Sequence, residues 1–252
     1  FAAVHTRSAI TEWLKYCMYF AVFYMVSDLA DTLKTKRIFL WTIVISAVGV
    51  SIIGLDAALG GNIVGILNKF FNVLGVKGSV FFGLFEANRI QSTLQYPNAL
   101  ASYLMAVFFV IIGLLITYDK LWQKVILGSF SFILFLTFML TESRGAQLLF
   151  PLVVIILLMT APKNYRINAV THVIALAIPS VVISLFLFPY LSEDTFSIKV
   201  LSLLILGLIV TVIISIFVKF IGECLQKIDW RVYIVIISVF ILISGIGLFY
   251  II

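Results

Sequence analysis

Apolar runs of about twenty residues, separated by short polar breaks, make up most of this 252-residue chain. A run of that length crosses the roughly 30 Å hydrocarbon core of a bilayer when it is helical. We therefore predict an all-α fold, a polytopic transmembrane helical bundle. Eight spans are expected, near residues 10–28, 38–56, 98–117, 125–141, 145–161, 169–188, 200–218 and 232–252.

The longest break, residues 57–96, is predicted to carry an amphipathic helix that lies at the membrane interface. Apolar side chains recur there at helical spacing, with polar residues between them, at Ile63, Leu67, Phe70, Phe71 and Leu74. Gly60-Gly61 at one end, and Gly75 with Gly78 at the other, are expected to end this helix. The helix either packs over the bundle or gates access to a substrate, and both interpretations stay open.

Composition supports the same class of protein. Hydrophobic residues make up 63% of the chain and charged residues 11%, and the mean hydropathy is +1.22, which excludes a water-soluble globular domain. The long runs also differ from the short alternating segments of an outer-membrane barrel. We expect a lipid bilayer around this protein and no nucleic-acid partner. Cys17 and Cys224 are too far apart to predict a disulfide or a metal site.

The ends of the sequence predict a fragment of a longer protein. The chain begins at Phe1 without a methionine, and residues 248–252 still belong to an apolar run. Neither end has the pattern of a targeting peptide. We expect residues 1–252 to be a single transmembrane domain, with upstream helices and a downstream external loop or domain missing.

The distribution of basic residues predicts the orientation of the bundle. Ten of the 17 Lys and Arg residues lie in four short polar breaks between the apolar runs, at residues 31–37, 118–124, 162–168 and 219–231. These are alternate breaks along the chain, so they lie on the same side of the membrane. Short loops rich in Lys and Arg stay on the cytoplasmic side, so those breaks are predicted to be cytoplasmic. The other breaks, which hold Arg89 and Arg144, then face the outside.

Two polar clusters carry the candidate chemistry. The first runs from Arg89 and Ser92 to a Tyr96-Pro97-Asn98 turn just before a span. Pro97 suits the first position of a helix, with Tyr96 extended before it. Asn98 is then expected to point inward, where its amide can bind a sugar or phosphate oxygen.

The second cluster is Thr141-Glu142-Ser143-Arg144-Gly145, at the junction of two spans. Arginine binds phosphate through two parallel hydrogen bonds, and the helix predicted to open near Ser143 offers free backbone N–H groups to an anion. Two alternatives stay open. Each arginine can be an anchor that reaches the headgroups, and Glu142 can form a local ion pair with Arg144.

The order and spacing of these motifs resemble one known family. An Arg-x-x-Ser-x-x-x-Tyr-Pro-Asn-x-x-Ala-x-Tyr pattern at residues 89–103 is followed, two spans later, by Thr-x-Ser-Arg-Gly-Ala at residues 141–146. Together they resemble the O-antigen ligase and O-antigen polymerase superfamily, and the resemblance spans the chain. Its members are bacterial inner-membrane glycosyltransferases of the GT-C type.

The resemblance implies an activity for the outer face of the membrane. A glycan carried on undecaprenyl pyrophosphate would be transferred to a hydroxyl of a glycan, lipid or protein acceptor, without a metal or cofactor. Arg89 and Arg144 would be the catalytic residues, because they would offset the charge of the leaving pyrophosphate. The substrate-binding residues would be Ser92, Tyr96, Asn98, Thr141 and Ser143.

One part of the family pattern has no counterpart here. The resemblance implies an acceptor-activating histidine in a large external loop, whereas His172 is predicted near the cytoplasmic end of its span and His5 in the opening segment. We expect that loop to begin after Ile252, and a degenerate, inactive relative is the alternative. A transporter or flippase of a lipid-linked or anionic substrate is the competing function, although the spans show no inverted repeat.

Overall fold

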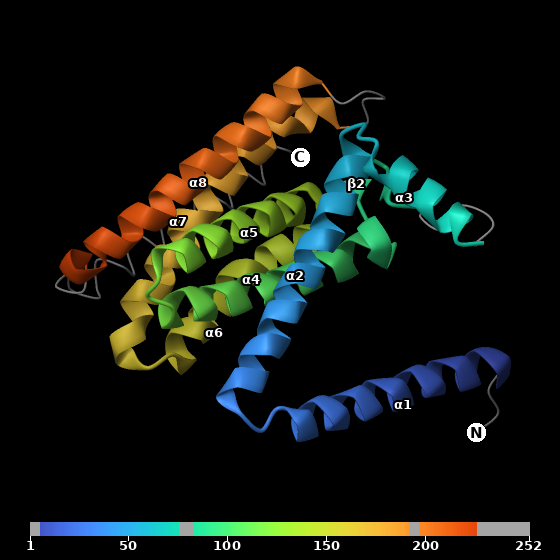
Figure 1. Ribbon diagram of the computed structural model, residues 1–252, viewed down its shortest axis with the longest axis horizontal. Helices are drawn as coiled ribbons and strands as arrows, with labels where there is room; N and C mark the ends of the chain where they lie inside the picture. Colours follow the sequence, from blue (N-terminus) through green and yellow to red (C-terminus); the bar gives the residue numbers. More distant parts are fainter. Residues whose placement is uncertain (1–5, 76–82, 192–196, 226–252) are drawn as a thin grey trace. The chain divides into compact units, whose positions relative to one another are not determined.

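The computed structural model describes residues 6–75, 83–191 and 197–225, which are almost entirely helical (Figure 1). The chain divides into two compact units, Phe1–Ile45 and Ser46–Ile252. The first unit contains α1 (Thr6–Leu29) and the start of α2 (Leu33–Ala58). The second contains the rest of α2 and, in order, α3 (Ile63–Val73), β1 (Phe85–Glu86), β2 (Arg89–Ile90), η1 (Ser92–Leu94), α4 (Pro97–Thr117), α5 (Leu121–Leu140), α6 (Arg144–Thr160), α7 (Lys163–Leu187), η2 (Phe188–Tyr190) and α8 (Ile198–Leu225).

The described helices make this a multi-pass membrane protein. Within the described ranges, five helical segments are long and apolar enough to cross a bilayer: Leu33–Ala58, Pro97–Thr117, Leu121–Leu140, Asn164–Tyr190 and Ile198–Val218. The predicted count of eight spans is not confirmed. α6 is apolar but has 17 residues, and the span predicted at 232–252 lies outside the described residues. α1 is helical, but Glu12, Lys15 and Asp28 lower its apolar content, and it is not among the five.

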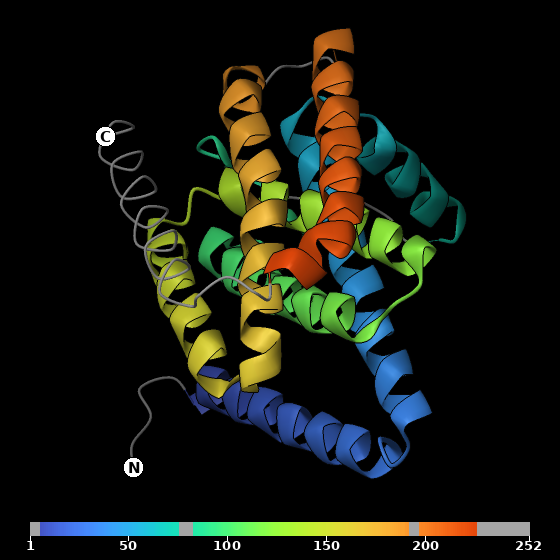
Figure 2. The same cartoon turned by 90° about the vertical axis from the view of Figure 1, so that its left-hand side faces the viewer.

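The core of the second unit is formed by α4, α5, α7 and α8. α5 packs against the other three helices, and α7 and α8 lie side by side (Figures 1 and 2). Gly207 of α8 permits the close packing of α8 against α5, because the ring of Phe132 on α5 occupies the space that a side chain at position 207 would need. A larger residue at position 207 would push α5 and α8 apart.

An aromatic cluster joins α4, α5 and α6. The ring centroids of Phe108 and Phe135 are 4.8 Å apart, those of Phe135 and Phe150 are 5.1 Å apart, and Phe138 lies 5.3 Å from Phe135. Aromatic pairs in this range contribute about 0.5–1.5 kcal/mol beyond their buried area. The cluster therefore fixes the ends of α5 and α6 from which the polar residues emerge.

The amphipathic helix predicted in residues 57–96 is present as α3. The predicted glycine ends are also found, since Gly60 and Gly75 both have positive φ, at 71° and 88°, whereas Gly78 lies outside the described residues. The buried carboxylate of Asp56 caps the start of this helix: its oxygens accept the N–H groups of Ile63 at 3.2 Å and Val64 at 2.9 Å.

Part of the same segment forms a hairpin that the sequence pattern does not predict. β1 and β2 pair antiparallel, with Glu86 opposite Arg89 and Phe85 opposite Ile90. The connecting residues Ala87 and Asn88 both have positive φ, as a two-residue hairpin turn requires. Strands of two residues are too short to leave an alternating pattern in a sequence.

Candidate functional site

The hairpin that carries Arg89 is fastened to the second half of α2. Ile90 and Ser92 are fully buried, and the Ser92 hydroxyl donates to the Val50 carbonyl oxygen at 2.6 Å. Gly54 allows this approach, because a Cβ at that position would lie 2.6 Å from Ile90 Cγ2 and 3.0 Å from Ser92 Cβ. α2 therefore sets the position of β2 and of Arg89 upon it.

Arg89 extends from β2 to the turn between α5 and α6. Its Nε donates to the Thr141 carbonyl oxygen at 3.0 Å, and its Nη2 donates to Asn98 Oδ1 at 3.2 Å. Two of the five guanidinium N–H donors are used in this way, so three have no partner among the described residues. Arg89 thus holds the two motifs together and keeps donors available for an anion.

Asn98 is the residue that links the two polar clusters. Its Oδ1 accepts the Ser143 hydroxyl at 2.8 Å as well as Arg89, and its Nδ2 donates to the Tyr96 hydroxyl at 3.2 Å. Pro97 opens α4 directly before it, with Tyr96 extended at φ −151° and ψ 115°, as predicted. The start of α4 is therefore bonded to the start of α6.

Thr141 and Ser143 shape the turn from inside. Both are buried, the Thr141 hydroxyl donates to the Phe138 carbonyl oxygen at 2.7 Å, and it accepts the Ser143 N–H at 3.3 Å. The Ser143 hydroxyl is used by Asn98, so it does not cap α6. These two hydroxyl groups hold the backbone that presents Arg144.

Arg144 is the first residue of α6 and is exposed. Within the described ranges its guanidinium has no hydrogen-bond or ion-pair partner. The Gly145 and Ala146 N–H groups follow it without a side-chain cap, and Gly145 faces open space. The start of α6 therefore combines a free guanidinium with backbone donors, a set that suits a phosphate group.

Glu142 lies between the two arginines. Partial burial raises the pKa of its carboxyl above the ordinary value, and the nearby positive charges of Arg89 and Arg144 oppose that rise. No ion pair joins Glu142 to either arginine in the described part of the chain. The local ion pair with Arg144, weighed as an alternative in the sequence, is thus not formed.

Strained backbone gathers at this site. Among the described non-glycine residues, those with positive φ are Ala87, Asn88, Ser92, Gln95 and Glu142. All five belong to the segment around Arg89 or to the turn before Arg144. Left-handed conformations at residues with a Cβ cost free energy and collect at functional sites.

The structure brings most of the predicted site residues together, at one end of α4, α5 and α6. Arg89, Tyr96, Asn98 and Arg144 are half-buried or exposed. Ser92 is buried against α2, and its hydroxyl donates to the Val50 carbonyl oxygen. Thr141 and Ser143 are also buried, and the hydrogen bonds of these three hydroxyl groups hold the backbone around the arginines. Val50 and Gly54 were missed in the sequence; a glycine inside an apolar helix is the one signal that could have indicated the contact.

His172 lies on α7, which contributes none of the candidate site residues. It is buried in the first half of α7, its Nδ1 is 2.8 Å from the Asn168 carbonyl oxygen, and Lys124 at the start of α5 is near it. This agrees with the packing role expected for it. His5 lies outside the described residues. No group of three or more His, Cys, Asp or Glu side chains that could hold a metal occurs in residues 6–75, 83–191 and 197–225.

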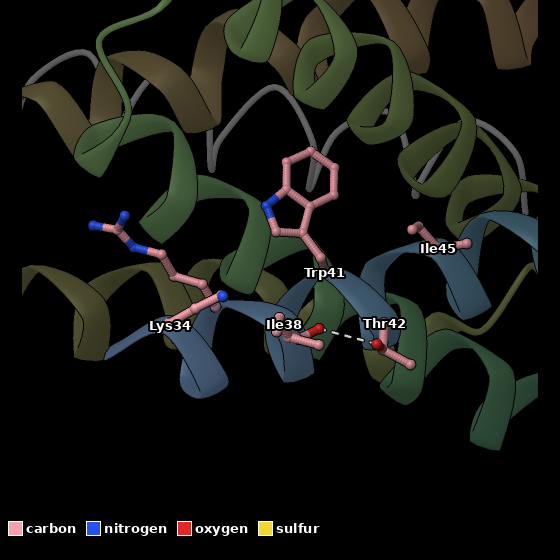
Figure 3. A pocket seen from close by; sticks show the side chains of 6 residues that line it. Lys34, Ile38, Trp41, Thr42 and Ile45 are labelled. Atoms are coloured by element: carbon pink, nitrogen blue, oxygen red, sulfur yellow. Dashed lines mark hydrogen bonds between the residues drawn. The ribbon is translucent and has the colours of Figure 1, made fainter. Parts of the chain in front are cut away.

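A hollow on the first unit follows the surface of α2. It is lined by Lys34, Arg37, Ile38, Trp41, Thr42 and Ile45 (Figure 3). All six side chains come from one helix, and the Thr42 hydroxyl donates to the Ile38 carbonyl oxygen at 2.9 Å within it. Because no second element contributes a polar group, the hollow lacks the convergent contacts of a binding site.

No family model, curated protein or solved structure matches this chain.

Proposed function

We propose that this protein is a glycosyltransferase of the O-antigen ligase type in the bacterial cytoplasmic membrane. It transfers a glycan from undecaprenyl pyrophosphate to an acceptor hydroxyl at the outer face. The observation that supports this best is the set of hydrogen bonds that joins Arg89 to Thr141 and Asn98, and Asn98 to Ser143. Residues 52 positions apart in the sequence meet in one place, close in the chain to Arg144, whose guanidinium has no hydrogen-bond partner among the described residues.

The chemistry of the site suits a diphosphate leaving group. In the transfer, the acceptor oxygen bonds to the anomeric carbon and the bond from that carbon to the phosphate oxygen breaks. The electron pair stays on undecaprenyl pyrophosphate, and the hydroxyl proton passes to a base. Arg144, the free donors of Arg89 and the N–H groups of Gly145 and Ala146 would offset the charge that develops on the diphosphate.

Reconstitution with a labelled donor tests the proposal. The protein is placed in liposomes with an undecaprenyl-pyrophosphate-linked glycan labelled in the sugar, and a mixture of candidate glycan and lipid acceptors is added outside. We expect the label to move to an acceptor with release of undecaprenyl pyrophosphate. The Arg144→Ala protein should do this at least about 100-fold more slowly.

Two results would contradict the proposal. Movement of the intact labelled donor between leaflets, with the sugar-phosphate bond unbroken, would indicate a flippase. Equal transfer by the wild-type and Arg144→Ala proteins would remove the site from the reaction.

A further inference from the structure

Glu142 is placed where a phosphate-binding site would least be expected to hold a carboxylate. It follows Thr141, whose carbonyl oxygen binds Arg89, and precedes Ser143 and Arg144. Its backbone is fixed by two hydrogen bonds, from Glu142 N–H to the Met139 carbonyl oxygen at 3.2 Å and from Arg144 N–H to the Glu142 carbonyl oxygen at 3.1 Å. The turn therefore fixes the point from which this side chain extends, two residues before Arg144.

The turn holds this glutamate in an unfavourable conformation. Its φ is +48°, in the left-handed region that glycine and asparagine adopt more easily. Glycine at this position would end α5 and form the turn equally well. The local backbone therefore gives no reason for a glutamate here.

The charges around Glu142 give such a reason. Arg89 on β2 and Arg144 on α6 both act on its carboxyl, and partial burial favours the neutral form. Two other titratable groups of the described residues lie close to these arginines. The Tyr96 phenol accepts a hydrogen bond from Asn98, and Glu86 on β1 lies opposite Arg89 and accepts a hydrogen bond from Gln91 at 3.3 Å. Glu142 differs from Glu86 in that both arginines act on its carboxyl.

We infer that Glu142 sets the affinity of this site for a diphosphate, by opposing the bound anion when it is ionised and ceasing to oppose it when it takes up a proton. The inference rests on the proposed function, because it assumes that Arg89 and Arg144 bind the diphosphate. In the empty site the carboxylate offsets part of the arginine charge. A bound diphosphate repels that carboxylate, so proton uptake accompanies binding.

The pH dependence follows from this linkage. At a pH above the raised pKa of Glu142, the carboxylate is charged and binding is weaker. As the pH falls through that pKa, the carboxyl becomes neutral and binding becomes tighter. A bound diphosphate raises the pKa further, so the change extends to a higher pH than in the empty site.

The test uses geranyl-pyrophosphoryl-N-acetylglucosamine, in which both phosphates are substituted and the charge stays constant over the range used. Its dissociation constant is measured between about pH 4 and pH 8 for the wild-type protein and for Glu142→Gln, Glu142→Gly and Asp119→Asn. At pH 8, Glu142→Gln and Glu142→Gly should bind about 3- to 30-fold more tightly than the wild type, the range expected for removal of one nearby charge. Their affinities should vary little with pH, and the wild type should approach them at the acid end. Asp119→Asn, which removes an exposed carboxylate between the end of α4 and the start of α5, at the other end of these helices, should follow the wild type.

Each outcome decides the inference. Glu142→Gly has no left-handed strain, so it provides a folded protein without the carboxylate even where the glutamine variant is unstable. Unchanged or weaker binding by both variants overturns the inference while the proposed function stands. Absence of binding by every variant at every pH overturns the anion site, and the proposed function with it.

Discussion

An arginine lies at each end of α6, and only one of the two makes hydrogen bonds that stabilise the fold. At the C-terminal end, Arg166 donates from Nε to the Ala161 carbonyl oxygen at 2.9 Å and from Nη2 to the Met159 carbonyl oxygen at 3.2 Å. A cation there satisfies carbonyl groups that the helix leaves unpaired and interacts favourably with the helix dipole. At the N-terminal end, Arg144 is the first helical residue, where the dipole disfavours a cation, and it binds nothing in the described structure.

This difference separates an arginine that stabilises the fold from one that the fold merely tolerates. Arg89 has features of both. It bonds to a backbone carbonyl oxygen, as Arg166 does. Like Arg144, however, it acts on the carboxyl of Glu142 and keeps guanidinium donors without a partner among the described residues. We therefore expect stability and anion binding to depend on these three residues in different proportions.

Arg89→Ala should have the largest effect. It removes the bonds to the Thr141 carbonyl oxygen and Asn98, at a cost of about 1–3 kcal/mol in unfolding free energy, and it separates the two motifs. Glycan transfer should fall by about 100-fold or more. Arg89→Lys keeps the charge but loses the two-point geometry, and it should also lose most of the transfer. The melting temperature in detergent and the transfer rate measure the two effects.

Arg166→Ala is the matched control for Arg89. It should lower the melting temperature by a comparable amount and leave transfer per folded molecule within about threefold of the wild type. If Arg166→Ala lost as much transfer as Arg89→Ala, the loss at Arg89 would be explained by reduced stability of the bundle and not by a role in transfer.

Arg144→Ala should affect activity alone. Because its guanidinium has no partner in the described structure, the unfolding free energy should stay within about 0.5 kcal/mol of the wild type. Transfer should nevertheless fall by about 100-fold. A clear decrease of the melting temperature with unchanged transfer would make Arg144 a structural residue.

Gly54→Ala should lower both stability and glycan transfer by an intermediate amount, because it displaces the hairpin that carries Arg89. The new methyl group would displace Ile90 and Ser92, at a cost of about 1–3 kcal/mol, and would move Arg89 with them. Gly49→Ala lies on the same helix with nothing within 4 Å of the added methyl group, so it should be neutral or slightly stabilising. Equal melting temperatures and equal transfer for the two variants would argue against α2 as the support of the hairpin.

Asp56→Asn should have the smallest effect on transfer. It weakens the cap of α3 by about 1 kcal/mol, so amide exchange in residues 63–73 should become faster. Transfer should stay within about threefold of the wild type, because no described contact joins Asp56 to the arginines. A large loss would favour the gating interpretation of this helix over simple packing.

The sequence predicted the features that depend on local pattern. Helices α2 and α4 to α8 follow from apolar length, α3 from its periodicity, and the start of α4 from Pro97. The hairpin and the role of Ser92 could not be predicted, because both depend on a tertiary contact with Val50 and Gly54. The meeting of Arg89 with Thr141 followed only from the assumption that both motifs lie at one end of the bundle.

Direct binding of undecaprenyl pyrophosphate to the wild-type, Arg144→Ala and Arg166→Ala proteins, measured by calorimetry in detergent, tests the central claim. We expect binding by the wild type, an affinity lower by about 10- to 100-fold for Arg144→Ala, and an affinity within about threefold of the wild type for Arg166→Ala. No binding by the wild type, or equal binding by all three proteins, would contradict it.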